Sequence, residues 1–218
     1  MDDAVKTRRQ YRSSRRAAQA QQTRRDIVTA AGVLFRDRGY AAPMTEIAAA
    51  AGVVVETVYR IFGTKAALFR EAVEALLAGG AGRAEVAVED RPAIRAMREE
   101  PDPRKQLAMY AATQPGIHRR AGPLLRALRD ARAADPELAR LWDEMEVWRL
   151  DGQGRFVRML AGRGVLRQGL EVDDAVDTTF TMCSLAVYDL LVRDRGWTDD
   201  RYRVWLTDTL VRELIGEC

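Results

Sequence analysis

Apolar residues recur every three or four positions along most of the chain, which is the spacing of amphipathic helices. The first such segment spans residues 24–38, beginning after Thr23, which together with Asp26 resembles a capping box, and stopping at Gly39. Its apolar stripe consists of Ile27, Ala31, Leu34 and Phe35. Because the alternation typical of strands is almost absent, the pattern predicts an all-α fold.

Two short helical segments and a longer one follow. Residues 46–51 are Ala-rich, Gly52 supplies a left-handed turn position, and residues 55–62 form another short helix. Thr64 is placed to cap a third segment that ends at Gly79 and Gly80. The glycines and the polar run that follows break the period over residues 79–91, which indicates a linker.

The second half of the chain opens its helices with an acid followed by proline. Asp102 precedes Pro103, and Asp135 precedes Pro136, so each aspartate is an expected N-cap. The helix from Pro136 continues to Gly162, with a possible bend at Gly152 and Gly154, and residues 173–193 and 199–214 form the last two helices. We therefore expect a disordered arm (1–22), a compact unit (23–80) and a larger helical unit (81–218).

Composition narrows the functional classes. Of the 218 residues, 47% are hydrophobic and 31% charged, which is typical of a soluble globular protein. No apolar run approaches the ~18 residues of a membrane span, and no secretory signal is evident, so a cytoplasmic protein without membrane contact is expected. With two cysteines, one histidine and no glycine-rich phosphate loop, the sequence predicts no metal site, no cofactor, no catalytic residues and no enzyme.

Positive charge is concentrated at the N-terminal end. Residues 1–63 hold 11 Lys and Arg against 6 Asp and Glu, a net charge of +5, whereas residues 64–218 hold 24 against 26, a net charge of −2. The arm is a polycation that would gain by releasing counterions from a polyanion, so nucleic acid is the first candidate partner. A solvated disordered tail is the alternative interpretation.

The stretch EIAAAAGVVVETVYRIFGTKAAL, residues 46–68, has the arrangement of a helix-turn-helix. Ala48 and Ala49 are small enough for two helices to cross closely, and Gly52 makes the turn. Val53, Val58 and Phe62 are expected to point inward, and the polar positions 57, 59 and 60 outward. Such a helix enters the major groove of DNA. The alternative is an ordinary helical hairpin.

IAAAAGV followed by TVYRIFGTKAALF resembles the DNA-binding domain of TetR-family transcriptional regulators. The resemblance covers residues 23–80, and beyond them only the helical plan and the length are similar. It implies a helix-turn-helix domain followed by a ligand-binding and dimerisation domain. It also implies a homodimeric repressor that binds double-stranded DNA, at a palindromic operator, and is released by a small-molecule effector.

The resemblance also implies DNA contacts at individual positions. Tyr59 and Lys65 match phosphate-contacting positions, and Thr57 matches a groove-facing one. Val55, Glu56 and Arg60 match positions that can reach base edges, and an arginine such as Arg60 can form a bidentate pair of hydrogen bonds with guanine. The alternative for Glu56 is a helix-opening acid that repels phosphates.

Two departures from the family pattern accompany this match. Val54 stands where a polar cap is usual, and the segment 40–47 is one residue short. Pro43 therefore stands near the position of a phosphate-contacting Thr, and Thr45 is an inwardly displaced candidate contact.

Large aromatic and methionine side chains in the second half of the chain are candidates for lining an effector pocket. The expected ligand-binding residues are Tyr110, Met145, Trp148, Phe156 and Met182. Gln114, His118 and Asp177 are polar candidates for orienting a ligand. Ordinary core packing is the alternative for the apolar residues, and an exposed position is the alternative for His118.

The penultimate helix carries a seam typical of helices packed side by side, made of Val176, Phe180, Cys183, Val187 and Leu190. With Leu206, Leu210 and Leu214 this seam predicts half of a four-helix dimer interface. Cys183 is interpreted as a small apolar residue of that seam, and the terminal Cys218 as exposed and incidental.

Other functions remain open at the level of the sequence. The helical hairpin is also compatible with a helical protein-protein interaction module. If the protein binds DNA, a ligand-independent regulator and an activator are alternatives to a ligand-released repressor. Steep salt dependence of binding to duplex DNA would separate a DNA binder from a protein binder.

Overall fold

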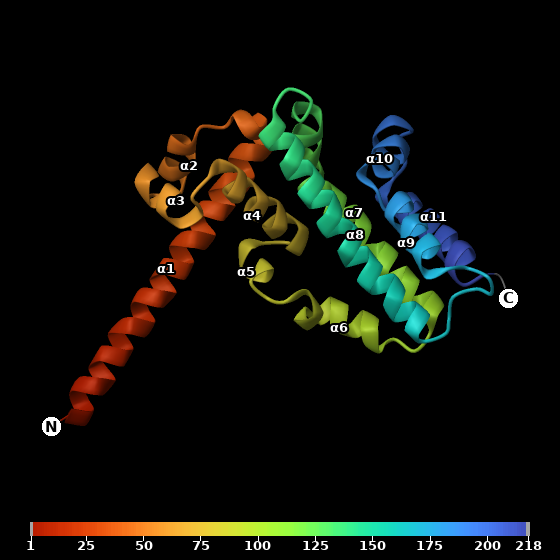
Figure 1. The fold of residues 1–218 in the computed structure, drawn as a ribbon, viewed down its shortest axis with the longest axis horizontal. Coiled ribbons are helices and arrows are strands. Elements are labelled where there is room, and N and C mark those ends of the chain that lie inside the picture. The colour runs from red at the N-terminus through yellow and green to blue at the C-terminus, as the bar shows by residue number, and fades with distance from the viewer. Residues whose placement is uncertain (1, 217–218) are drawn as a thin grey trace. The chain divides into compact units, whose positions relative to one another are not determined.

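The computed structural model describes residues 2–216, and the side chains of residues 15–216. Cys218 lies outside this range, and so do the side chains of the first basic residues of the arm. All secondary structure within the described range is helical, as Figure 1 shows, which confirms the all-α prediction.

The chain divides into two compact units, residues 1–85 and 86–218. The division lies five residues after the expected boundary at residue 80, because α5 (Ala81–Ala84) packs with the N-terminal helices. Arg25 also donates a hydrogen bond of 2.8 Å to the Glu85 carboxylate, which ties the end of this unit to its first helix.

Helix α1 spans Asp2–Arg38, so the expected disordered arm over 1–22 and the helix start at 24 differ from the structure. Thr23 is an interior helical residue, and its hydroxyl donates to the carbonyl of Gln19, 3.0 Å away, instead of capping a helix start. The physical reason is the absence of proline before Pro43, together with many Ala, Gln and Arg residues that favour helix. The helix ends at Gly39, whose φ of 64° admits the short 3-10 turn η1 (Gly39–Ala41).

Three further helices complete the N-terminal unit: α2 (Met44–Ala50), α3 (Val55–Phe62) and α4 (Lys65–Ala78). The Thr64 hydroxyl accepts a 3.1 Å hydrogen bond from the amide of Ala67, which confirms the expected cap, and Gly79 ends α4 in the left-handed region. The large side chains of the fully buried core of this unit include Ile27, Phe35, Ile47, Val58, Leu68 and Phe69.

In the C-terminal unit, α7 (Pro103–Ala131) and α8 (Pro136–Gly162) are the longest helices. Both expected caps are confirmed, because Asp102 and Asp135 each accept a 2.8 Å hydrogen bond from the amide two residues ahead. Helix α8 continues through Gly152 and Gly154. The expected linker over residues 79–91 contains α5 and the 3-10 turn η2 (Val88–Asp90), and α6 (Pro92–Glu99) follows it.

The last two helical segments lie along α7 and α8 (Figure 1). The expected single helix over 173–193 is broken into α9 (Val172–Met182), α10 (Leu185–Tyr188) and the π-helical turn η3 (Asp189–Asp194). Ser184 begins α10 by accepting a hydrogen bond from the amide of Val187 at 3.2 Å. Helix α11 spans Asp199–Leu214, as expected, with Thr198 as its cap.

Part of the expected dimer seam is wrong, because its residues belong to the core of their own chain. Val176 is 6% exposed and Cys183 1% exposed. Leu206, Leu210 and Leu214 of α11 are 0% exposed and join the same cluster. Of the seam, Leu190 alone is exposed, at 55%.

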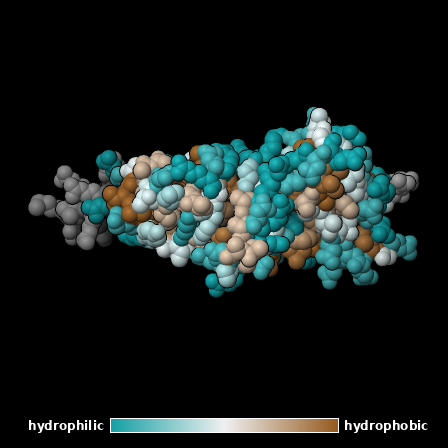
Figure 2. Space-filling model, turned by 90° about the horizontal axis from the view of Figure 1, so that it is seen from above, coloured by the Kyte–Doolittle hydropathy of each residue, from teal (hydrophilic) through white to brown (hydrophobic). Residues whose placement is uncertain are grey.

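The face of the molecule in Figure 2 is mainly hydrophilic, with hydrophobic residues in separate patches. No single described helix is both long enough and apolar enough to cross a membrane. The bent pair 172–182 and 185–194, with 41° between its parts, satisfies these criteria when joined, by length and composition only.

Candidate nucleic-acid interface

The turn between α2 and α3 is held by consecutive backbone hydrogen bonds. The amides of Ala51, Gly52 and Val53 donate to carbonyls of α2 at 3.0–3.1 Å. Gly52 has a φ of 68°, a conformation that side chains disfavour, so glycine at this position allows the chain to reverse tightly. The two short helices are thereby held in the arrangement that the sequence predicted.

Helix α3 divides its side chains between the core and solvent. Val58 is fully buried and Phe62 nearly so, as the spacing predicted. Glu56, Tyr59 and Arg60 are exposed on the opposite side, whereas the expected contacts Val55 and Thr57 are half-buried. Within the described residues, neither Glu56 nor Arg60 has an ion-pair partner on the protein, so both charged groups are available to a ligand.

Lys65, the first residue of α4, is placed by an aromatic cluster. Its ammonium lies 4.8 Å from the centre of the Tyr40 ring, a cation–π contact. Tyr40 in turn packs edge-on to Phe69, with ring centres 5.5 Å apart. Burial lowers the pKa of Lys65. Sequence analysis offered no signal that the Tyr40 ring would support Lys65.

A second cation is fixed beside the end of α3. The guanidinium of Arg24 lies 4.7 Å from the centre of the Phe62 ring and pairs with Glu71 of α4. This arrangement ties α1, α3 and α4 together. Sequence analysis did not select Arg24, because the residues concerned are distant along the chain.

The two departures from the family pattern have structural counterparts. Val54 occupies the N-cap position of α3 with extended backbone angles, and its side chain is 65% exposed and makes no capping hydrogen bond among the described residues. Pro43 takes the corresponding position before α2, where its carbonyl accepts from the amides of Glu46 and Ile47 at 3.1 and 3.2 Å. Thr45 is exposed in the first turn of α2.

The expected effector residues are distributed unevenly through the C-terminal unit. Tyr110 and Phe156 stack with ring centres 4.2 Å apart, and Met182 packs against the same cluster. Met145 is buried outside this cluster, and Trp148 is 43% exposed. The structure therefore brings three of the five residues together.

His118 lies in the interior of the C-terminal unit, at 5% exposure, so the exposed alternative is wrong. Its ring stacks on Tyr188 with centres 4.6 Å apart and meets Tyr202 edge-on at 6.3 Å. Burial, followed by the positive charge of Arg149, lowers the pKa of His118 to about 4. Sequence analysis missed Tyr188 and Tyr202, which reach His118 from other helices. Of the other polar candidates, Gln114 is buried and Asp177 exposed.

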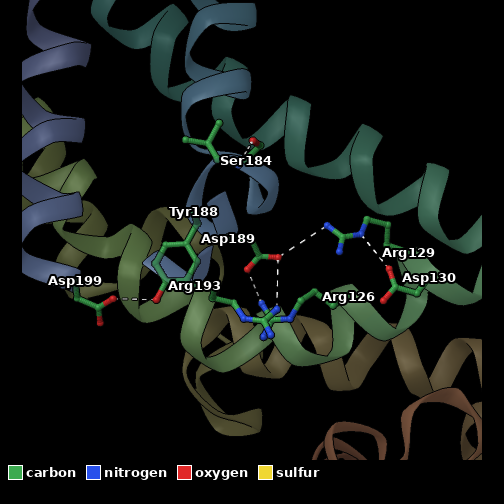
Figure 3. Close-up of polar contacts among 9 residues, drawn as sticks. Arg126, Arg129, Asp130, Ser184, Tyr188, Asp189, Arg193 and Asp199 are labelled. Atoms are coloured by element: carbon green, nitrogen blue, oxygen red, sulfur yellow. Dashed lines mark hydrogen bonds and ion pairs between the residues drawn. The ribbon is translucent and has the colours of Figure 1, made fainter. Parts of the chain in front are cut away.

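Tyr188 and its neighbour Asp189 link α10 and η3 to other helices, as Figure 3 shows. The Tyr188 hydroxyl donates to Asp199 at 2.9 Å, and burial with this contact raises the pKa of Tyr188 to about 12. Asp189 accepts from Arg126 of α7 at 2.8 Å and lies within 4.0 Å of Arg129 and Arg193. Residues 188 and 189 thus hold the π-helical turn against α7 and α11.

Metal-ligating side chains do not gather anywhere within the described residues in a group that would hold an ion. The features that remain are the exposed face of α3 and the buried aromatic cluster around His118.

Comparison with known proteins identifies the N-terminal unit. Residues 27–72 match the family described as bacterial regulatory proteins, tetR family. This stretch contains α2, the turn, α3 and Lys65. No curated protein matches the chain.

Solved structures share the whole fold at low sequence identity. A TetR-family transcriptional regulator from Rhodococcus sp. is 15% identical, with a TM-score of 0.67 over 88% of this chain and 98% of that one. The fatty acid degradation regulator FadR from Bacillus halodurans is 20% identical, with a TM-score of 0.65 over 85% and 96%.

A transcriptional regulator from Saccharomonospora viridis, in complex with choline, is also 20% identical, with a TM-score of 0.64 over 89% and 98% of the two chains. The helix-turn-helix unit described above thus belongs to the tetR family of bacterial regulatory proteins, and the chain as a whole has the fold of TetR-family transcriptional regulators.

Proposed function

We propose that this protein is a homodimeric transcription regulator that binds a palindromic operator in double-stranded DNA through α3 and is released from it by a small-molecule effector. The observation that carries the proposal is the exposed face of α3 inside a tetR-family helix-turn-helix, with Arg60 unpaired among the described residues. A repressor is the simplest form of such a regulator, because an operator-bound dimer obstructs transcription.

The chemistry of this face suits DNA. Arg60 can donate two hydrogen bonds to guanine, and Glu56 can accept from cytosine. Tyr59, which is 49% exposed, and Lys65 at the start of α4 are placed to meet phosphates. Thr45, Val55 and Thr57 complete the proposed contact set.

The effector is proposed to bind in the C-terminal unit. Support comes from its buried aromatic and sulfur-containing cluster, which includes Tyr110, Phe156 and Met182. The choline-bound protein from Saccharomonospora viridis has the same fold, and choline is an example of a small molecule held by such a regulator. Met145 and Trp148 stay in the proposal as secondary positions.

The proposal is tested by selecting binding sites for the full chain from random duplex DNA and measuring affinity for the selected site as salt is varied. We expect half-sites related by a two-fold axis and a logarithmic affinity that falls linearly with the logarithm of salt concentration. If no duplex is enriched, DNA recognition is excluded and the protein-protein interaction module becomes the better interpretation. Enrichment that no small molecule relieves would instead support a ligand-independent regulator.

A further inference from the structure

Three buried polar atoms in the C-terminal unit have no hydrogen-bond partner among the described residues. They are both ring nitrogens of His118 on α7 and the hydroxyl oxygen of Tyr202 on α11. The backbone of Cys183 lies close enough to the His118 ring to act on its pKa, but no hydrogen bond of normal geometry joins the two. His118 is 5% exposed and Tyr202 0% exposed, so bulk water does not satisfy them. Buried polar groups in folded proteins are nearly always paired, and leaving one unpaired is destabilising.

Tyr188 is the third ring of this cluster, and its hydroxyl group, unlike that of Tyr202, has a hydrogen-bond partner on the protein. Tyr188 packs edge-on to Tyr202, with ring centres 5.1 Å apart, and stacks on His118. Its hydroxyl is already bonded to Asp199. The unmet hydrogen-bonding capacity therefore belongs to His118 and Tyr202 alone within this aromatic group.

The charged side chains around the cluster are matched on the protein itself. Arg149 donates to Glu146 at 2.9 Å and to the carbonyl of Phe180 at 2.8 Å. Arg126 is paired with Asp189. A charged ligand beside His118 would have to separate one of these pairs or remain uncompensated in the interior, and both are unfavourable.

We infer that His118 and Tyr202 form the polar end of an internal ligand site, and that the ligand is an uncharged planar molecule carrying a hydroxyl or carbonyl group. The neutral imidazole offers one donor and one acceptor, and the tyrosine hydroxyl offers one more of each. The rings of Tyr188 and Tyr202, which surround the His118 ring, favour an aromatic partner over an aliphatic one. The inference deepens the effector binding proposed above and rests on it, but it does not depend on DNA recognition.

The single histidine of the chain makes this site directly observable, because all imidazole nitrogen signals come from His118. The full-length protein, without DNA, is titrated with four probes that share one ring: phenol, toluene, benzoate and benzyltrimethylammonium. We expect phenol alone to shift the His118 nitrogen resonances saturably, towards one fixed neutral tautomer. Benzoate and benzyltrimethylammonium carry the charge that the site disfavours, and toluene lacks the hydrogen-bonding group.

Two variants define which group binds the probe. Tyr202→Phe removes one unpaired hydroxyl, and should weaken the apparent affinity for phenol by roughly 5- to 10-fold without destabilising the free protein. Thr207→Val is the matched control, since it removes from the same helix a hydroxyl that already donates to the Arg203 carbonyl at 2.9 Å. The control should bind phenol as the unmodified protein does.

The inference is overturned if phenol causes no saturable shift, which would mean that water alone satisfies these atoms, or if either charged probe binds as well as phenol. It is also overturned if Tyr202→Phe and Thr207→Val respond alike. Loss of operator binding in a separate assay would contradict the proposed DNA-binding function and leave the result of the probe titration standing.

Discussion

Arg60 is the side chain on which base recognition depends most in the proposed complex. It projects from α3 without an ion-pair partner among the described residues, whereas Lys65 is held over the Tyr40 ring. A free guanidinium can reach a base edge, and an anchored ammonium is better suited to a fixed phosphate. The two cations are therefore expected to contribute differently to binding.

We expect Arg60→Ala to relax preference at one base pair of each half-site, with a loss of ~1 to 3 kcal/mol of discrimination. Tyr59→Phe and Lys65→Ala should weaken all sites alike, because phosphate contacts carry no sequence information. Competition among operators that differ by single bases measures both effects. A uniform loss for Arg60→Ala would make Arg60 a backbone contact and assign specificity to Val55, Glu56, Thr57 or the shape of the DNA.

His118 is expected to make stability depend on pH. The folded protein lowers its pKa from 6.5 to about 4, so the unfolded chain takes up a proton at a higher pH than the folded chain. The free energy of unfolding therefore has its full value above pH 6.5. It decreases as the pH falls towards 4, by roughly 3 kcal/mol in total, because the unfolded chain is protonated first. Urea unfolding of the unmodified protein and of His118→Phe across this range measures the difference. Equal pH dependence in the two proteins would exclude His118 as the cause.

At the scale of single elements, helix starts are the positions where one side chain changes stability most predictably. Helix α4 has a cap at Thr64, whereas the Val54 side chain provides none for α3. The backbone at Val54, with φ −83° and ψ 152°, already has the extended conformation that a capping serine uses. Substitutions at the N-cap positions of α4 and α3 are therefore expected to change stability in opposite directions.

We expect Thr64→Ala to lower the free energy of unfolding by about 1 kcal/mol and Val54→Ser to raise it by about 0.5 to 1 kcal/mol. Because Val54 is 65% exposed, replacing it removes little buried apolar surface. Val54→Ala is the control that shortens the side chain without adding an acceptor. Denaturant midpoints measured by circular dichroism decide this, and a serine variant no more stable than the alanine variant would contradict the capping argument.

At the scale of the whole molecule, the N-terminal arm should strengthen DNA binding without choosing the site. Changing Lys6, Arg8, Arg9, Arg12, Arg15 and Arg16 to Gln should lower affinity and flatten its salt dependence, because fewer counterions are released. Gln also favours helix, so the extension of α1 over these residues is compatible with the change. Fluorescence anisotropy at several salt concentrations measures the slope. An unchanged slope would show that the arm does not contact DNA.

The proposed homodimer is best tested at the apolar residues that stay exposed on the last helical segments. Leu190 is 55% exposed and Val204 is 48% exposed. Replacing both with Glu should give monomers, because pairing would bury the new charges. Phe180 is unsuitable for this test, since Arg149 stacks on its ring at 3.4 Å within the chain.

Val33→Glu, at a 43% exposed position in the N-terminal unit, is the control and should leave the oligomeric state unchanged. Sedimentation velocity at micromolar concentration distinguishes the two species. A dimer that persists in the Leu190 and Val204 variant would place the interface on another face of the protein.

The sequence by itself determined the all-α fold, the helix-turn-helix and the capped or glycine-stopped ends of several helices. Caps such as Thr64 and Asp102, and glycine stops such as Gly39 and Gly79, act on backbone groups within one helical turn. The spacing along α3 likewise separated buried Val58 and Phe62 from exposed Tyr59 and Arg60. These features are local, so neighbouring residues are sufficient to specify them.

Only the tertiary structure decided which faces of the C-terminal helices meet. Periodicity showed an apolar seam through Val176 and Cys183, but it did not show whether another helix of the same chain or of a partner covers it, and the chain's own core does. It also gave no sign that His118, Tyr188 and Tyr202 converge from three separate helices. Helical spacing identifies a buried face, whereas the partner of that face depends on packing between residues far apart in sequence.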